Sequence, residues 1–283
     1  MLDIDTYKLR AKNIYKNIYR RVKILEMYDR FLKSKDLEPN IDSLNLWIDS
    51  LDRRGLSEGS IVEYTYVVLS YFNIMMIDVD DRKLRLLKMR LPKRSIKPAE
   101  FLTVDEVSRL INGTEDIMKR LIYSLAYTYA RRLGEVLQLT WDDVDLDNGR
   151  ITFTILKKNR FERAEYELES WIVDMFKEYI EAYFGGRVNR GDKVFPISIR
   201  TVQISFKKDC RRCGIPDNGR RLRPHLLRHS RITHLSEMGV PLETISKELA
   251  RHSRLDTTFQ FYLGVTKKMR ASIPKASDIL TTK

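Results

Sequence analysis

One segment near the end of the sequence holds most of the side chains that could act on a phosphate group. It contains all four histidines of the chain, His225, His229, His234 and His252, and Tyr262 follows ten residues later. On a helix, His225 and Arg228 would share a face because they lie three residues apart. A guanidinium can hold an anion, an imidazole can transfer a proton and a phenol can act as a nucleophile. This combination indicates phosphoryl transfer.

The composition indicates a polyanionic partner. The 283 residues carry 52 Lys and Arg against 39 Asp and Glu, which gives a net charge of +13 and a pI near 9.6. Such a basic balance favours nucleic acid, with an acidic membrane surface as the second candidate. No apolar run approaches the roughly 20 residues of a membrane span, and the first ten residues lack the apolar core of a signal peptide. We therefore expect a cytoplasmic protein that binds nucleic acid.

The hydrophobic pattern predicts helices and no strand before residue 90. These helices should span about 5–32, 41–54, 57–77 and 81–90. The third is so rich in apolar residues that it should form the buried centre. Residues 1–90 are thus expected to form an all-helical domain.

Residues 91–100 separate this domain from the rest of the chain. Their sequence combines two prolines with basic residues, among them Lys93 and Arg94, and has no periodic apolar face, which is typical of a linker. Thr103 and Glu106 then have the spacing of a capping box, which predicts that a new helix opens a second domain over 101–283.

The second domain is expected to be mostly helical, with a small antiparallel sheet. The pattern predicts a long helix over 115–138, with a break near Gly134 left open. Ile151, Phe153 and Ile155 then alternate as a strand does, and a basic turn leads to the partner strand. Most of the sequence after residue 170 has a helical pattern.

The order of four motifs resembles the catalytic domain of the tyrosine recombinases. These motifs are Arg-x-Gly-Glu at 132–135, a lysine in the hairpin turn, His-x-x-Arg-His at 225–229, and then a histidine and a tyrosine. The resemblance covers roughly 100–265, and the preceding helices resemble the core-binding domain of that family, a SAM-like helical bundle. The chain is most similar to the compact Xer-type resolvases of chromosome dimers, in their archaeal branch.

This resemblance implies six catalytic residues, Arg132, Lys158, His225, Arg228, His252 and Tyr262. Arg132 and Arg228 would hold the scissile phosphate, and Tyr262 would attack it to leave a 3′-phosphotyrosyl link. His225 would act as the base and Lys158 as the acid, with Lys157 as an alternative to Lys158. Neither ATP nor a metal would be required.

Further residues are implied in support and in DNA binding. Glu135 would hold the Arg132 guanidinium, and His252 would contact the phosphate or orient the site. Contacts to DNA are expected from Lys93, Arg94, Arg220, Arg221 and Arg223, although the last three also fit a solvated loop. The resemblance also implies a duplex DNA substrate and a tetramer on two sites. Its subunits would exchange the tail after Tyr262.

The sequence departs from the family pattern in two places. Arg251 stands where the family usually has glycine, and Tyr262 follows His252 by ten residues where nine are usual. One extra residue turns a helical side chain by about 100 degrees, so delivery of the tyrosine in cis or in trans stays open. We interpret His229 and His234 as packing or capping residues. Three tyrosines of an apolar helix are expected in the core, Tyr123, Tyr127 and Tyr129.

Three other functions also fit parts of the sequence. An integrase of a mobile element and a strand transferase like the type IB topoisomerases would use the same chemistry. Cys210 and Cys213, the only cysteines, argue against a disulfide framework, but with His225 and His229 they approach the spacing of a zinc finger. That pattern would make the chain a DNA-binding regulator without catalysis.

Overall fold

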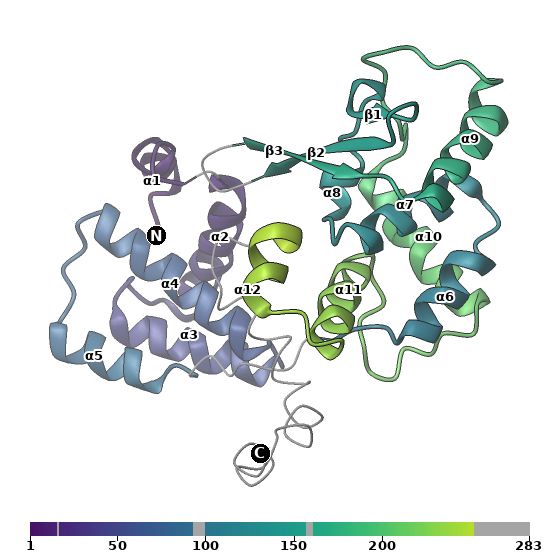
Figure 1. Cartoon of the computed structure of the whole chain (residues 1–283). Coiled ribbons are helices and arrows are strands. Elements are labelled where there is room, and N and C mark those ends of the chain that lie inside the picture. The colour runs from purple at the N-terminus through teal and green to yellow at the C-terminus, as the bar shows by residue number, and fades with distance from the viewer. Residues whose placement is uncertain (16, 93–99, 157–160, 252–283) are drawn as a thin grey trace, which may run out of the picture. The chain divides into compact units, whose positions relative to one another are not determined.

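The computed structural model describes residues 1–15, 17–92, 100–156 and 161–251. Contacts between Cα atoms divide the chain into two compact units, Met1–Ile96 and Lys97–Lys283 (Figure 1). The described residues include no helix that is long and apolar enough to cross a membrane.

The described residues of the first unit form helices joined by turns, with no strand. Its helices are α1 (Ile4–Ala11), α2 (Ile18–Lys35), α3 (Ile41–Arg53), α4 (Glu58–Ile74) and α5 (Asp81–Arg90). As expected from its composition, α4 is central and packs against α1, α2 and α3. The single helix predicted over 5–32 was wrong, because Asn17 starts a separate helix by accepting a hydrogen bond from the backbone of Arg20.

The second unit is mostly helical, with one antiparallel sheet. Up to the sheet it contains α6 (Val104–Gly113), α7 (Ile117–Thr128), α8 (Leu133–Val136) and the 3-10 turn η1 (Trp141–Asp143). The strands are β1 (Val144–Asp145), β2 (Arg150–Leu156) and β3 (Phe161–Glu167). After them come α9 (Ser170–Phe184), α10 (Ile199–Arg212), α11 (His225–Glu237), α12 (Leu242–Thr244) and the π-helix η2 (Ile245–Ala250).

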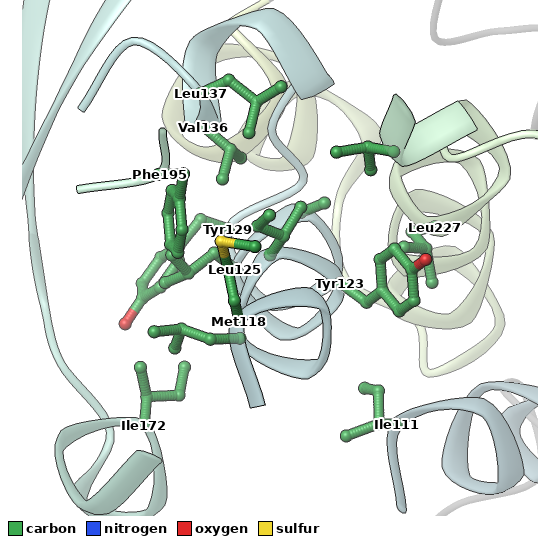
Figure 2. Close-up of a cluster of buried hydrophobic side chains, with 14 of the residues drawn as sticks. Ile111, Met118, Tyr123, Leu125, Tyr129, Val136, Leu137, Ile172, Phe195 and Leu227 are labelled. Carbon is green, nitrogen blue, oxygen red and sulfur yellow. The ribbon is translucent and has the colours of Figure 1, made fainter. Parts of the chain in front are cut away.

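The core of this unit surrounds α7, which packs against α6, α9 and α11. Figure 2 shows apolar side chains from these neighbours, Ile111 of α6, Ile172 of α9 and Leu227 of α11, around those of α7. Tyr123 and Tyr129 are almost fully buried here, as expected for core tyrosines. The capping box is also confirmed, since Thr103 and Glu106 exchange hydrogen bonds at the start of α6.

The predicted hairpin is confirmed. The strand order is β1-β2-β3, and β2 pairs with β3 from Arg150 opposite Glu167 to Leu156 opposite Phe161. The alternating residues Ile151, Phe153 and Ile155 are all buried. β1 was not predicted because two residues are too few to show an alternating pattern.

Two helices end close to a left-handed residue. The helix predicted over 115–138 stops at Thr128, ahead of Gly134, and Ala130 adopts a left-handed conformation with φ of 48°. The short helix α12 passes into the π-helix η2, which ends at Ala250, and Arg251 is left-handed with φ of 51°. Both breaks lie beside the candidate site.

Candidate active site

Arg132 and Glu135 form a local unit at the start of α8. Both oxygens of Glu135 are engaged, one by the Arg132 backbone N–H at 3.0 Å and the other by Arg132 Nη1 at 2.7 Å. The Glu135 side chain is fully buried, whereas 40% of the Arg132 side chain is exposed. The contact expected between these residues is therefore present, and it leaves the guanidinium open to solvent on one side.

Arg228 reaches the same region from α11. Its side chain is 1% exposed, Nη1 donates to the carbonyl of Ala130, and Nη2 donates to the carbonyl of Ala250 at 2.6 Å. Burial and the neighbouring charges of Arg132 and Arg131 lower the pKa of Arg228. A guanidinium still stays charged at neutral pH, and five N–H groups allow further bonds beyond these two. No described carboxylate forms an ion pair with Arg228.

His225 opens α11 one turn before Arg228 and is half-buried. Burial is the main reason that its pKa falls to about 3, and the charges of His229, Arg228 and Arg132 add to the effect. The imidazole is therefore neutral at pH 7, and a phosphate anion bound beside it would favour its protonation. The structure thus brings Arg132, Arg228 and His225 within electrostatic reach of one another, from two separate segments.

Arg131 is a second buried guanidinium in this region. Its side chain is 1% exposed, Nε donates to the carbonyl of Tyr129 at 2.6 Å, and Nη2 donates to the carbonyl of Leu249. The guanidinium carbon lies 5.6 Å from the ring centroid of Phe153 and 5.1 Å from that of Tyr166. The combined arrangement is a set of fixed cations beside a neutral base, which suits stabilisation of a pentavalent phosphate.

Residues 100–269 match the model of the phage integrase family, which is more than half of the chain. The chain belongs to that family. This recombinase is 33% identical to the tyrosine recombinase XerA of Thermococcus kodakarensis over 253 residues, which are 85% of this chain and 83% of the relative. It is 27% identical to XerA of Pyrococcus horikoshii over 269 residues, 91% of this chain and 88% of that relative. The predicted kinship with archaeal Xer-type recombinases is confirmed.

Solved structures share the fold of the recombinase. The Tn1549 transposon integrase in complex with transposon right end DNA has a TM-score of 0.71 at 15% identity, covering 95% of this chain and 98% of that one. A lambda integrase dimer bound to a core site has a TM-score of 0.69 at 16% identity, covering 91% and 93%. Together with the helices and the small sheet, these likenesses confirm the predicted fold class.

Several predicted site residues lie outside the described part of the recombinase. They are Lys93, Arg94, Lys157, Lys158, His252 and Tyr262. The described residues next to them are Leu156 and Phe161, which end the two strands of the hairpin, and Arg251, which directly precedes His252.

Arg251 gives a physical reason for the glycine that the family usually has at this place. Its φ of 51° lies in the left-handed region, which glycine enters without steric cost. In this recombinase the position is stabilised by an ion pair, in which Arg251 Nη1 lies 2.9 Å from Oε1 of Glu162 on β3. Sequence reasoning noted the departure but not the pairing, because Glu162 is 89 residues away.

His229 and His234, both on α11, contact the first residues of the second unit. His229 Nδ1 lies 3.1 Å from the carbonyl of Glu100, and its ring meets that of His225 at 4.4 Å between centroids. His234 lies between the Tyr127 hydroxyl, which donates to Nδ1, and the Leu102 carbonyl, which accepts from Nε2, both at 3.0 Å. These contacts fit the packing interpretation of the two histidines.

Arg220 has a different environment from the other two arginines of its loop. Nη1 and Nη2 form a two-pronged ion pair with Glu106 at 2.8 and 2.6 Å, and Nη1 also donates to the carbonyl of Phe101. Arg221 and Arg223 are exposed. We therefore leave Arg220 out of the DNA contacts proposed below and keep Arg221 and Arg223.

The zinc-finger interpretation was wrong. Cys210 is buried on α10 and Cys213 caps that helix, whereas a finger would place the pair on a hairpin. Burial raises the pKa of Cys210 to about 12, so its thiol stays protonated. Among the described residues, which include both cysteines and His225 and His229, no three His, Cys, Asp or Glu side chains are grouped to hold a metal ion.

Arg131 was not predicted as a site residue from the sequence. Its buried position depends on carbonyls and rings that are distant in the sequence, Leu249 among them. The single local hint is an arginine inside an apolar helix pattern, next to the arginine of the motif.

Proposed function

We propose that this recombinase cuts and rejoins duplex DNA at specific sites through a 3′-phosphotyrosyl intermediate. The observation that carries the proposal is the convergence of Arg132 and Arg228 beside a neutral His225. Two fixed guanidiniums can bind the nonbridging oxygens of one phosphodiester, and the planar fork of arginine suits that task. The proposed division of the chain is a DNA-binding bundle over 1–90, a basic linker over 91–100 and a catalytic domain over 101–283.

The proposed reaction is a substitution at phosphorus. The phenolic oxygen of Tyr262 forms a bond to phosphorus while the bond to the 5′-oxygen breaks, and His225 takes the phenolic proton. Lys158, or Lys157, gives a proton to the departing 5′-oxygen, and His252 hydrogen-bonds the phosphate. Negative charge grows on the nonbridging oxygens in the transition state, so Arg132 and Arg228 stabilise that state more than the ground state.

The proposed partners follow from the named relatives and from the charge of the chain. Duplex DNA is the substrate, and Arg221, Arg223, Lys93 and Arg94 contact it. Four subunits assemble on two DNA sites and exchange the tail after Tyr262. Structures of similar fold include recombinases bound to their sites, such as XerH with its difH substrate. We propose that the recombinase resolves chromosome or plasmid dimers in the cytoplasm.

A nicked duplex that traps the covalent intermediate tests this function. Wild type, Tyr262→Phe and a control, Tyr183→Phe, are incubated in EDTA with duplexes carrying candidate sites from the host chromosome. Tyr183 is a partly exposed tyrosine of α9. A covalent protein-DNA band is expected from wild type and the control but not from Tyr262→Phe. A band from Tyr262→Phe, or none from wild type on DNA that it binds, would refute the proposal.

A further inference from the structure

The last carbonyls of the π-helix η2 are each capped by a side chain from elsewhere in the fold. The Tyr166 hydroxyl donates to the carbonyl of Glu248 at 3.1 Å, Arg131 Nη2 donates to that of Leu249, and Arg228 Nη2 donates to that of Ala250 at 2.6 Å. The final carbonyls of a helix lack partners within it. These three side chains therefore fix the helix end that directly precedes Arg251 and His252.

Arg131, a member of this set, contacts several segments of the site. Through Nε it holds the carbonyl of Tyr129 in the turn that leads to Arg132, and through Nη2 it holds η2. Its guanidinium also lies against rings of both hairpin strands, Phe153 of β2 and Tyr166 of β3. One side chain thus ties together the turn before Arg132, the strands that flank 157–160 and the segment that ends at Arg251.

The burial of Arg131 is costly. The side chain is 1% exposed, and among the described residues Nη1 has no hydrogen-bond partner and no carboxylate pairs with the guanidinium. Burial lowers the pKa of Arg131. A buried charge without an opposite charge carries a desolvation cost that hydrogen bonds to carbonyls offset only in part. A cation kept in such a place therefore points to a role in the reaction.

We propose that Arg131 is a positioning residue for strand cleavage. It fixes the placement of the turn that leads to Arg132, of strands β2 and β3, and of the end of η2 at Ala250, without contacting the phosphate itself. This inference rests on the proposed function, because it assigns Arg131 to the same site. It predicts that loss of Arg131 slows cleavage while DNA affinity is retained.

The test compares single-turnover cleavage of the nicked duplex with equilibrium binding of the same DNA, using the full chain. Arg131→Met retains most of the volume and removes every donor. It loses the cost of the buried charge but leaves the carbonyls of Tyr129 and Leu249 without this partner, so we expect a melting temperature close to that of wild type. Its cleavage rate should fall about a hundredfold, the scale of lost positioning, with the dissociation constant changed less than about threefold. Arg187→Ala, at an exposed arginine after α9, is the matched control and should behave as wild type.

Chemical rescue separates positioning from general support of the fold. Arg131→Ala leaves a space for a small cation, so methylguanidinium should raise its cleavage rate at least about tenfold, whereas methylammonium at equal ionic strength should not. Wild-type cleavage by Arg131→Met, or a slow Arg131→Ala that methylguanidinium fails to rescue, would overturn the inference. A wild type that forms no covalent complex would overturn the proposed function, and this inference with it.

Discussion

Arg228 Nη2 donates a 2.6 Å hydrogen bond to the carbonyl of Ala250, across 22 residues of sequence. The same guanidinium also donates to the carbonyl of Ala130, so one side chain spans both left-handed breaks of the site. This geometry needs the fork of arginine, because a lysine amine is a single point of charge.

Arg228→Lys keeps the positive charge but loses the forked guanidinium, so it tests whether the reaction needs the charge alone or also its geometry. We expect the cleavage rate to fall by about 10²–10³, the usual effect of removing one transition-state donor, although the charge is kept. Single-turnover cleavage on saturating DNA measures this. A rate within about threefold of wild type would mean that charge alone is sufficient at this position.

Glu135→Gln tests the support of Arg132. The amide keeps one acceptor where the carboxylate has two, so it cannot hold both the Arg132 backbone and Nη1 as Glu135 does. We expect cleavage to slow about tenfold, in line with other residues that orient a functional group, and less than with Arg132→Ala. Glu165→Gln, at an exposed pair with Arg150, is the control and should leave the rate unchanged.

The lowered histidine pKa values predict how stability depends on pH. Burial lowers the pKa of His225 from its ordinary 6.5 to about 3, so as pH falls below 6.5 the unfolded chain takes up a proton that the folded chain does not. The free energy of unfolding should thus fall from pH 6.5 toward 3, by at most about 1.4 kcal/mol per pH unit for this histidine, and be independent of it above 6.5. Urea unfolding of wild type and His225→Gln from pH 4 to 8 measures the difference. A constant difference across that range would contradict the prediction.

Substitutions at Arg251 should separate backbone strain from the ion pair. Arg251→Gly and Arg251→Ala both lose the contact with Glu162, but only alanine keeps the steric cost of φ near 51°. We expect the glycine variant to be more stable than the alanine variant by about 1 kcal/mol, measured by urea unfolding. Equal stabilities would show that the left-handed conformation relaxes when the arginine is removed.

The arginines before α11 should divide into two classes. Arg223→Ala should weaken DNA binding and reduce the slope of log K against log salt by about 1, as loss of one phosphate contact does. Arg220→Ala should leave that slope unchanged but lower stability by about 1–3 kcal/mol, since Glu106 stays buried without its partner. Salt titrations of binding, with unfolding curves, distinguish the two. A reduced slope for Arg220→Ala would make it a DNA contact after all.

The sequence was most informative where the signal is local. The capping box at Thr103 and Glu106, the alternation of Ile151, Phe153 and Ile155, and the spacing of Arg132 from Glu135 depend on neighbouring residues, and their expected contacts are present. These local features, together with the order of the four motifs, were sufficient for the fold class and the family.

Features that depend on distant partners could not be predicted. The backbone breaks at Ala130 and Arg251 contain neither glycine nor proline. Arg228 contacts Ala130 and Glu162 contacts Arg251, and each partner is far away in the sequence. The burial of Arg131 and the pairing of Arg220 with Glu106 are of the same kind. Hydrophobic periodicity shows which face of a helix or strand is apolar. It does not show which arginine donates a hydrogen bond to a carbonyl or carboxylate that is distant in the sequence.

The partners of Arg131 and Arg228 also determine what the site offers to a substrate. Carbonyl dipoles orient both guanidiniums, and no described carboxylate forms an ion pair with either. An incoming phosphodiester would thus not have to displace a carboxylate from Arg228. Neutral backbone fixes the direction of these cations, and the counterion that completes the site is the DNA itself.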